Sequence, residues 1–258
     1  MDDIKDEIEN TQIVVLAGGA AKRMGSNEPK ALLKLNGKPL IDYCIELYKN
    51  CGFKNFVLLL GYKSNEIKKY IEEKKFGVNI KISVEPDTCK GKGKALKYAL
   101  QNGSLDKNKR VIIHFPDDVL LDKRLPIRLL LHHLHGVETL HTVATNVFVS
   151  GTFYPFGTGE IDNRGIVTTF IEKPFIDKLT NTGMCIFEPE VYEYIEKLID
   201  MNSKEPIEFE KTVLPKLASE RKLYSMVLSP DIWISINTQK EYEDAEKIVS
   251  NYLKLNKT

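Results

Sequence analysis

The residues best suited to chemistry lie in the stretch LAGGAAKRMGSNEPK, residues 16–30, which combines glycines with two separated cations. Gly18 and Gly19 lack a Cβ atom, so the backbone can approach a phosphate closely and point its N–H groups at it. Arg23 and Lys30 can offset the negative charge of a polyphosphate. A strand-like apolar run leads directly into this stretch. The stretch is therefore a candidate phosphate-binding loop.

The spacing within this loop excludes two commoner phosphate-binding patterns. The loop lacks the G-x-x-x-x-G-K-[ST] spacing of a P-loop, and it lacks the G-x-G-x-x-G of a dinucleotide-binding fold. A glycine turn with an incidental surface arginine and lysine is the remaining structural interpretation. Taken alone, the loop indicates phosphate binding without identifying a reaction.

A second candidate site is the segment HFPDDVLLD, residues 114–122, in which two adjacent carboxylates follow a buried-strand pattern. Ligand sites of open α/β sheets lie at the carboxyl ends of strands. Mg²⁺ prefers one or two carboxylates together with phosphate oxygens and water. Asp117 or Asp118 can therefore hold a Mg²⁺ that bridges to a triphosphate. An Asx turn or a helix N-cap also favours Asp at such a position.

Several motifs occur in an order that resembles the sugar-1-phosphate nucleotidyltransferases, or NDP-sugar pyrophosphorylases, of the glucose-1-phosphate uridylyl- and thymidylyltransferase type. In chain order, the matching segments are LAGG, KRMG and EPKALLKLNGKPLID within residues 16–42, PD at 116–117, FGTGEID at 156–162, IEKP at 171–174 and NTGMCIF at 181–187. The last three segments distinguish the sugar branch from the shorter cytidylyltransferases, which share the N-terminal loop. The resemblance extends over most of the chain.

This resemblance implies a reaction and a set of site residues. An NTP, with UTP or dTTP favoured, would react with a sugar 1-phosphate, with glucose 1-phosphate favoured, to give an NDP-sugar and pyrophosphate. Mg²⁺ would be the cofactor, held by Asp117, and the catalytic residues would be Arg23, Lys30 and Lys173. The nucleotide-binding residues would be Leu16, Ala17, Gly18, Gly19, Glu85 and Gly91. The residues binding the sugar phosphate would be Gly157, Glu172, Lys173 and Asn181.

One segment departs from the pattern of these enzymes. Their C-terminal part commonly reads W-[IL]-D-[IVT]-G-T, with the Asp as a second magnesium ligand, whereas this chain reads WISINT at residues 233–238. Ser235 stands in place of the carboxylate, and a neutral hydroxyl is a poorer ligand for a hard cation. Asp117 could act with Asp118 or water, Asp231 could substitute, or the metal could bind weakly. Two other functions stay open: a cytidylyltransferase for a polyol, choline or isoprenoid phosphate, and a non-catalytic nucleotide-sugar sensor.

Composition limits the partners of the chain. The 258 residues carry a formal net charge of +1, with 37 basic and 36 acidic residues, which argues against nucleic acid or an anionic membrane surface as a partner. The four cysteines form no C-x-x-C pair and indicate reduced thiols. The acidic N-terminus lacks the features of a signal peptide, so we expect a cytoplasmic protein. The resemblance is compatible with a homo-oligomer.

The elements that must position these residues alternate between strand and helix patterns. Strands are predicted at residues 12–16, 56–60, 80–84 and 110–115, and helices at 39–51, 64–73 and 92–101. A further helix is predicted from near Asp122 to a stop at Gly136. This order predicts an α/β fold with a doubly wound, mostly parallel, Rossmann-like sheet and helices on both faces.

Beyond residue 139 the pattern changes to extended segments separated by Gly, Pro and Asn, which predicts a mixed-sheet, sugar-binding insertion against the same core. Helices are then predicted near residues 189–199 and 208–219, and strands near 223–228 and 232–236. We expect one nucleotidyltransferase domain over residues 1–258. Its nucleotide-binding half would span about 12–122, its sugar-phosphate-binding half about 139–238, and its C-terminal helix 239–258.

Overall fold

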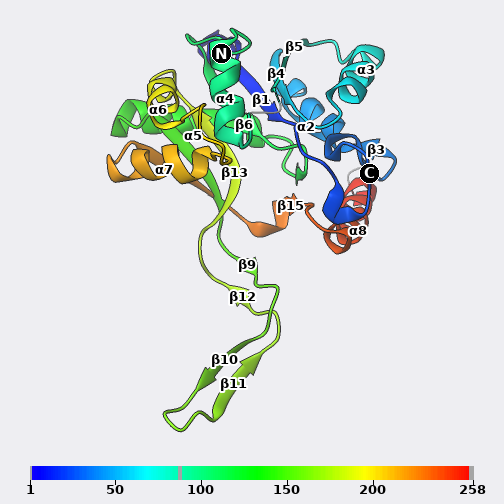
Figure 1. Cartoon of the computed structure of the whole chain (residues 1–258), viewed down its shortest axis with the longest axis vertical. Coiled ribbons are helices and arrows are strands. Elements are labelled where there is room, and N and C mark those ends of the chain that lie inside the picture. The colour runs from blue at the N-terminus through cyan, green and yellow to red at the C-terminus, as the bar shows by residue number, and fades with distance from the viewer. Residues whose placement is uncertain (1, 87–88, 256–258) are drawn as a thin grey trace.

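The computed structural model describes residues 2–86 and 89–255, and its centre is a seven-stranded sheet (Figure 1). The strands lie in the order β14 (Leu223–Leu228), β8 (Ala144–Val149), β13 (Thr180–Phe187), β6 (Arg110–His114), β1 (Thr11–Leu16), β4 (Asn55–Leu60) and β5 (Asn79–Val84). All pairs are parallel except those of β13, which runs antiparallel to β6 and β8. The predicted, mostly parallel sheet is confirmed.

Helices cover both faces of this sheet, as the doubly wound prediction requires. One apolar core includes residues of α2 (Leu40–Lys49), α3 (Ser64–Lys74) and α5 (Leu125–Leu140), with α1 (Asp2–Glu9) packed at its margin. The core on the other face includes α4 (Lys92–Gln101), α6 (Val191–Leu198) and α7 (Phe209–Ser219). In β1, Ile13 and Val15 belong to the first core and Val14 to the second, so a continuous apolar run is needed.

A third apolar cluster lies beside the carboxyl edge of β6. It joins α8 (Gln239–Leu255) to the short strands β2 (Lys34–Leu35), β7 (Asp118–Leu120) and β15 (Trp233–Ser235), while β3 (Lys38–Pro39) pairs with β2. Strand β15 pairs antiparallel with β7 and places Ser235 opposite Asp118. In the described part of the chain, no helix has both the length and the apolar character needed to cross a membrane.

Two local predictions need correction. Helix α5 does not stop at Gly136 but continues to Leu140, and His141 ends it in a left-handed conformation with φ 55°. Gly136 is a packing residue, because a Cβ there would lie 2.5 Å from the Tyr224 ring. Helix α1 forms in the acidic N-terminal segment, for which no element was predicted.

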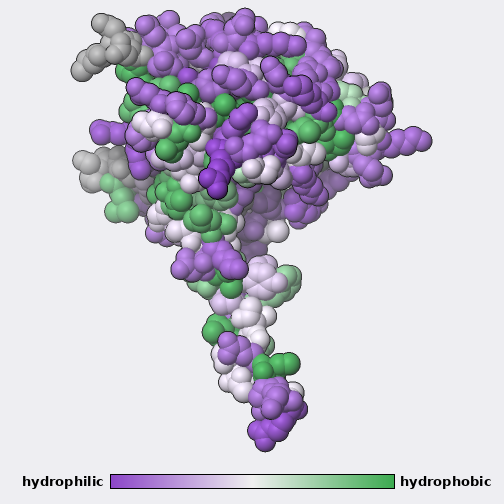
Figure 2. Space-filling view, turned by 90° about the vertical axis from the view of Figure 1, so that its left-hand side faces the viewer, coloured by the Kyte–Doolittle hydropathy of each residue, from purple (hydrophilic) through white to green (hydrophobic). Residues whose placement is uncertain are grey.

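The segment between β8 and β13 forms an arm, defined as residues 150–179, that projects from the body (Figures 1 and 2). Its lower part pairs β9 (Thr152–Phe153) with β12 (Phe175–Ile176), and its outer part pairs β10 (Thr158–Ile161) with β11 (Val167–Ile171). Neither ribbon joins the central sheet. The expectation that this insertion packs against the same core is therefore wrong for the arm, although β8 and β13 do enter the core.

Candidate active site

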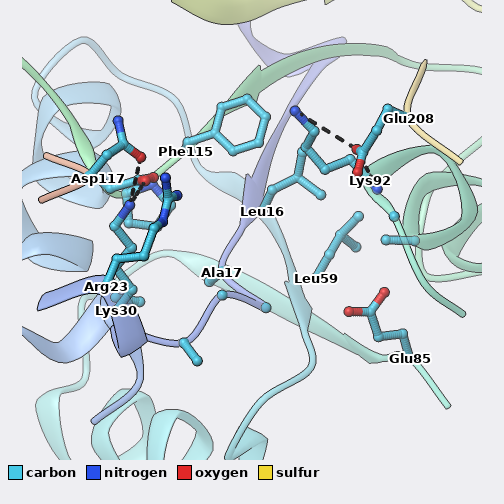
Figure 3. A pocket seen from close by; sticks show the side chains of 18 residues that line it. Leu16, Ala17, Arg23, Lys30, Leu59, Glu85, Lys92, Phe115, Asp117 and Glu208 are labelled. Atoms are coloured by element: carbon cyan, nitrogen blue, oxygen red, sulfur yellow. Dashed lines mark hydrogen bonds and ion pairs between the residues drawn. The ribbon is translucent and has the colours of Figure 1, made fainter. Parts of the chain in front are cut away.

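A cavity of about 310 Å³ opens at the carboxyl edge of β1 and β6 (Figure 3). Its walls are the loop after β1, the end of β5, the start of α4, the turn after β6 and the segments that lead into α7 and α8. The lining includes nine residues singled out from the sequence: Leu16, Ala17, Gly18, Gly19, Arg23, Lys30, Glu85, Gly91 and Asp117. Residues that lie far apart in the sequence are thus brought to one site by the parallel strands.

The two loop glycines, Gly18 and Gly19, differ in how closely other atoms surround them. A Cβ on Gly18 would lie 3.2 Å from the backbone nitrogen of Gly61 and 2.9 Å from a carboxylate oxygen of Glu85, so the neighbouring strand end requires glycine there. A Cβ on Gly19 would meet nothing within 4 Å among the described residues. The backbone at Gly19 is therefore open to an incoming ligand.

Charged groups converge at one end of the cavity (Figure 3). Lys30 lies in a short 3₁₀ helix (Lys30–Leu32), forms an ion pair with the carboxylate of Asp117, and donates to the side-chain oxygen of Asn237 at 3.0 Å. Arg23 lies in another 3₁₀ helix (Lys22–Met24), is exposed, and has no side-chain partner in residues 2–86 or 89–255. Two cations and one carboxylate thus face the same space.

The second carboxylate of the Asp pair does not line this cavity, but it lines a neighbouring hollow together with Asp117 and Ser235. The Trp233 indole N–H donates to Asp118 at 2.9 Å, and burial, with the nearby Asp117 charge, raises the pKa of Asp118. The ring of His114 receives a hydrogen bond from Tyr48 (3.0 Å) and donates to the backbone oxygen of Asp118 (2.7 Å). Asp118 and His114 therefore hold the turn that presents Asp117.

Ser235 occupies the position opposite Asp118, as β15 pairs with β7. Its hydroxyl accepts a hydrogen bond of 2.6 Å from the Asn237 amide, whose oxygen in turn accepts from Lys30. Ser235 therefore supports the cation cluster through Asn237. Residues 2–86 and 89–255 contain no group of three or more His, Cys, Asp or Glu side chains arranged to hold a metal ion.

Two carboxylates lie at the other end of the cavity. Glu85 follows β5 and points into the cavity (Figure 3), and its carboxylate has no hydrogen-bond partner in the described part of the chain. Burial, together with the charge of Glu208, raises the pKa of Glu85 to about 7. Glu208 accepts a hydrogen bond of 3.0 Å from the backbone N–H of Lys92, at the start of α4.

Gly91 is fixed by its neighbours in this wall. Its φ is 97°, and a Cβ would lie 2.5 Å from the backbone nitrogen of Ile207. The Ile207 N–H donates to Lys90 at 3.1 Å, and the Ile207 carbonyl accepts from Gly93 at 2.9 Å. Glycine is therefore required both by conformation and by this close approach.

The residues expected to bind the sugar phosphate are not all brought together. Asn181 lines a hollow next to the cavity, with Asp117 and Ser235 in the same wall, and its side-chain oxygen accepts from Asn146 at 3.0 Å. Gly157, Glu172 and Lys173 instead lie on the arm and line neither hollow.

Lys173 and Glu172 form only a loose exposed pair, with Nζ and Oε1 3.9 Å apart. Gly157 packs against the arm's own Phe170, since a Cβ there would lie 2.7 Å from that ring. The structure therefore separates the arm residues from the charged cavity.

Three lining residues with polar side chains were not proposed as site residues from the sequence: Lys92, Glu208 and Asn237. Asn237 lies within WISINT, and no sequence pattern indicates that this neutral side chain contacts Lys30. Glu208 begins a predicted helix and could have been recognised only as a cap residue. Lys92 belongs to a lysine-rich helix start, a pattern that also fits side chains exposed to water.

Known proteins resemble this chain in sequence. A profile of the family described as nucleotidyl transferase matches residues 12–251. A mannose-1-phosphate guanylyltransferase catalytic subunit beta of Drosophila pseudoobscura pseudoobscura is 28% identical over 239 residues, covering 90% of this chain and 60% of the relative. A UTP–glucose-1-phosphate uridylyltransferase of Synechocystis is 28% identical over 249 residues, covering 90% and 61%. The chain thus spans about three fifths of the length of these relatives.

A solved structure shows the same fold. It is a protein from Bacillus anthracis assigned as a glucose-1-phosphate thymidylyltransferase, in complex with sucrose, and it superposes with a TM-score of 0.70 at 19% identity. The superposition covers 92% of this chain and 94% of the other. The arrangement of the elements is therefore shared with that protein.

Proposed function

This chain belongs to the nucleotidyl transferase family, and we propose that it transfers a nucleotidyl group from a nucleoside triphosphate to a sugar 1-phosphate. A phosphate oxygen of the sugar phosphate would attack the α-phosphorus, and the bond to the bridging oxygen would break to release pyrophosphate. The observation that carries this proposal is the cavity in which Arg23, Lys30 and Asp117 surround an open glycine backbone.

No general base is needed for this reaction. The second pKa of a phosphate monoester is about 6, so the nucleophile is already anionic near neutral pH. The protein has to position two anions and offset their charge, which is the usual source of rate in such transfers. We assign the leaving pyrophosphate to Arg23 and the α-phosphate to Lys30. Lys30 is held in place by its contacts to Asp117 and Asn237.

Mg²⁺ fits the donor set around Asp117. One Asp117 oxygen is paired with Lys30, and the other has no partner in residues 2–86 or 89–255. Mg²⁺ commonly uses one carboxylate and completes its shell with substrate phosphates and water, so a protein cage is unnecessary. When bound, the ion would neutralise charge on the phosphates. Asn237 and Ser235 offer neutral oxygens beside this position.

The base preference rests on Glu85. UTP and dTTP were favoured from the sequence, whereas the names of several relatives point to GTP. Guanine presents two neighbouring N–H donors that one carboxylate can accept together, while uracil and thymine present one N–H between two carbonyl oxygens. Above pH 7 the Glu85 carboxyl is ionised and matches guanine. We therefore propose GTP as the donor, and a hexose 1-phosphate as the acceptor bound beside Asn181.

The test is pyrophosphate release at about pH 8 with Mg²⁺, measured for GTP, UTP, dTTP, CTP and ATP against mannose, glucose, galactose and N-acetylglucosamine 1-phosphates. We expect turnover with GTP and one or more of these sugar phosphates. Glu85→Gln is the matched variant, because its amide offers one donor and one acceptor and should shift the preference toward UTP or dTTP.

Several outcomes would change the proposal. Activity with CTP and a polyol phosphate, but with no sugar phosphate, would replace the acceptor class. Nucleotide binding without turnover in any combination would indicate a sensor. A Glu85→Gln protein with an unchanged base preference would remove Glu85 from base selection and leave the reaction class intact.

A further inference from the structure

Lys92 lies where the cavity meets the neighbouring hollow that Asn181 lines. The hollow has a volume of about 380 Å³. Four residues line both spaces and form the junction between them: Lys92, Phe115, Asp117 and Asn237. Arg23 and Lys30 line the cavity but not the hollow. Among the described residues, Lys92 is therefore the one cation in the wall of both spaces.

The other ionisable groups in the wall of the hollow are acidic. They are the carboxyl groups of Asp117, Asp118 and Glu210, and Lys92 is the only cation that residues 2–86 and 89–255 contribute to this wall. A sugar 1-phosphate carries close to two negative charges near neutral pH, because the second pKa of a phosphate monoester is about 6. The wall would therefore repel the phosphate of an acceptor, unless that phosphate lay against Lys92 or a bound metal ion.

Three contacts hold Lys92 at the junction. Its ammonium group forms an ion pair with Glu210 of α7 and lies 5.0 Å from the centre of the Phe115 ring (Figure 3), which is a cation–π distance. Its backbone N–H donates to Glu208 at 3.0 Å. The Phe115 ring packs against Gly183, which has a φ of 84° and where a Cβ would lie 2.8 Å from the ring. The charge is therefore in place before a ligand binds.

The ion pair with Glu210 leaves Lys92 able to bind a further anion. An ammonium group has three N–H donors, and among the described residues only Glu210 accepts from this one, since Glu208 is 3.8 Å away. The Lys92 side chain is 37% exposed, whereas that of Glu210 is 16% exposed. A phosphate can therefore reach the ammonium group while Glu210 continues to hold it.

We propose that Lys92 holds the phosphate of the acceptor at the junction, with the sugar extending along the hollow toward Asn181. Lys173, for which the sequence resemblance implied this role, lies on the arm and lines neither space. At the junction the acceptor phosphate faces the α-phosphate assigned to Lys30. Lys92 would then offset the repulsion between the two anions and orient the attacking oxygen. This inference rests on the proposed function, because it names the residue that binds the acceptor of that reaction.

The test is steady-state pyrophosphate release with the nucleotide and the sugar 1-phosphate that the unmodified protein uses best. Lys92→Met keeps an unbranched side chain but removes the charge. It should raise the KM for the sugar 1-phosphate by at least about tenfold, because a charge-assisted hydrogen bond is lost. The KM for the nucleotide should stay within about twofold. Lys92→Arg keeps the charge and should recover part of the loss.

Two further variants serve as controls. Lys90→Met is matched to Lys92→Met, since Lys90 carries the same charge two residues away, is exposed and lines neither space. Its KM for the sugar 1-phosphate should stay within about twofold of the unmodified value. Lys92→Met leaves Glu210, which has one buried carboxylate oxygen without a hydrogen-bond partner in the described part of the chain, without its cation. The double variant Lys92→Met/Glu210→Gln removes both charges and should also raise this KM.

Failure of this inference and failure of the proposed function give different results. If the unmodified protein turned over no combination of nucleotide and sugar phosphate, both would be overturned. If it turned over a sugar phosphate whose KM did not change in Lys92→Met or in the double variant, only the role of Lys92 would be overturned. A KM for the nucleotide that rises as much as that for the sugar phosphate, or a rise found in Lys173→Met and not in Lys92→Met, would also overturn that role.

Discussion

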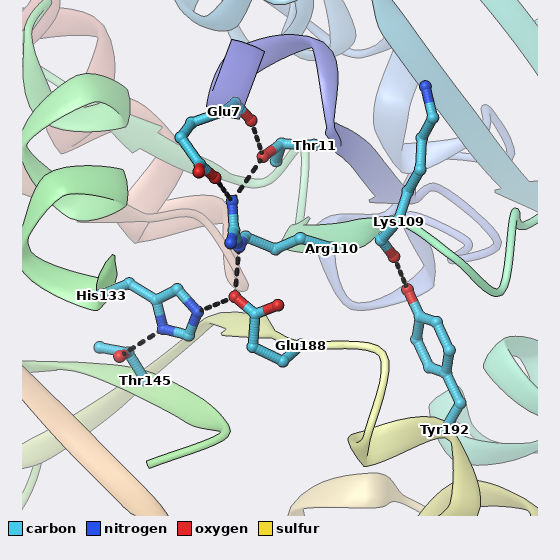
Figure 4. A network of polar contacts seen from close by, with 8 residues as sticks. All are labelled: Glu7, Thr11, Lys109, Arg110, His133, Thr145, Glu188 and Tyr192. Atoms are coloured by element: carbon cyan, nitrogen blue, oxygen red, sulfur yellow. Dashed lines mark hydrogen bonds and ion pairs between the residues drawn. The ribbon is translucent and has the colours of Figure 1, made fainter. Parts of the chain in front are cut away.

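At the amino edge of the parallel strands, Arg110 donates to Glu7 at 2.7 Å and pairs with Glu188, which also accepts from His133 at 2.9 Å (Figure 4). At the carboxyl edge, Arg23 and Glu85 face a cavity and have no side-chain partner among the described residues. Burial alone would raise the pKa of Glu188, but the His133 hydrogen bond and the Arg110 charge outweigh it and lower that pKa. Burial and Glu208 raise the pKa of Glu85 instead.

The difference separates two uses of charge in one fold. Charges that satisfy one another bind the elements together, because a buried ion without its partner is costly. Charges that face a cavity unpaired are available to a ligand. Substitutions at the two edges should therefore affect different quantities.

The largest effect is expected at the carboxyl edge. Lys30→Ala should lower kcat by at least about 100-fold, because it removes a preorganised cation from the reacting phosphate. Lys109→Ala is the control, since Lys109 lies at the opposite edge and its ammonium group donates to the exposed Glu9 carbonyl at 3.0 Å. Steady-state pyrophosphate release measures both variants. Near-normal turnover in Lys30→Ala would contradict the assigned role.

At the amino edge, Arg110→Met should lower the free energy of unfolding by about 3 kcal/mol, since it leaves Glu188 buried without its cation. Turnover per folded molecule should stay within about twofold of the unmodified protein. Urea unfolding measures the loss. Arg128→Met, which breaks an exposed pair with Asp122, should cost less than about 1 kcal/mol. Equal losses in the two variants would remove the distinction between the edges.

Each edge also buries a histidine, and protonation of either histidine in acid should lower the free energy of unfolding. Burial lowers the pKa of His114 to about 4, and burial lowers that of His133 despite Glu188. Unfolded histidine, with a pKa near about 6.5, takes up protons first as pH falls, so stability is complete above that pH and declines below it. His114 alone should cost roughly 2 kcal/mol by about pH 5. The raised pKa values of Glu85 and Asp118 act in the opposite direction, so the test compares urea unfolding of the unmodified protein and of His114→Gln between about pH 8 and pH 5. The stability advantage of the unmodified protein should shrink toward acid, and an advantage that is constant over this range would contradict the prediction.

The smallest effect is expected from a substitution that adds a negative charge at the carboxyl edge. Ser235→Asp would place a third carboxylate beside Asp117 and Asp118 and should lower the Mg²⁺ concentration for half-maximal activity a few-fold. Ser235→Ala is the control for the lost hydroxyl. A Mg²⁺ requirement that is unchanged in Ser235→Asp would mean that the ion does not contact this position.

The charged end of the cavity was predictable because its members follow apolar strand patterns. Residues such as Lys30 and Asp117 meet because parallel strands end at one edge, which is a property of the fold class. The arm was not predictable in the same way. The β-branched and aromatic residues of β11 fit a half-buried strand equally well whether the cover comes from this chain or from another molecule. The segment that carries Lys173 was correctly predicted to be part of an insertion. The prediction that this insertion packs against the core was wrong for the arm.

Residues that close the cavity from distant loops also escaped prediction. Glu208 and Asn237 take their positions from contacts to Lys92 and Lys30, which no local pattern encodes. The predicted helix end at Gly136 was wrong for a related reason. A glycine that ends a helix and a glycine that makes room for a neighbouring ring cannot be distinguished in the sequence.

The contact between Lys30 and Asn237 spans 207 residues, and this has a consequence for protein synthesis. Lys30 leaves the ribosome long before Asn237. Strand β6 can form its pairing with β13 only after β13 has been synthesised. A nascent chain that has reached only residue 200 would hold Arg23, Lys30 and Asp117 but would lack the Glu208 and Asn237 walls of the cavity. The complete cavity therefore forms only after residue 237 has left the ribosome.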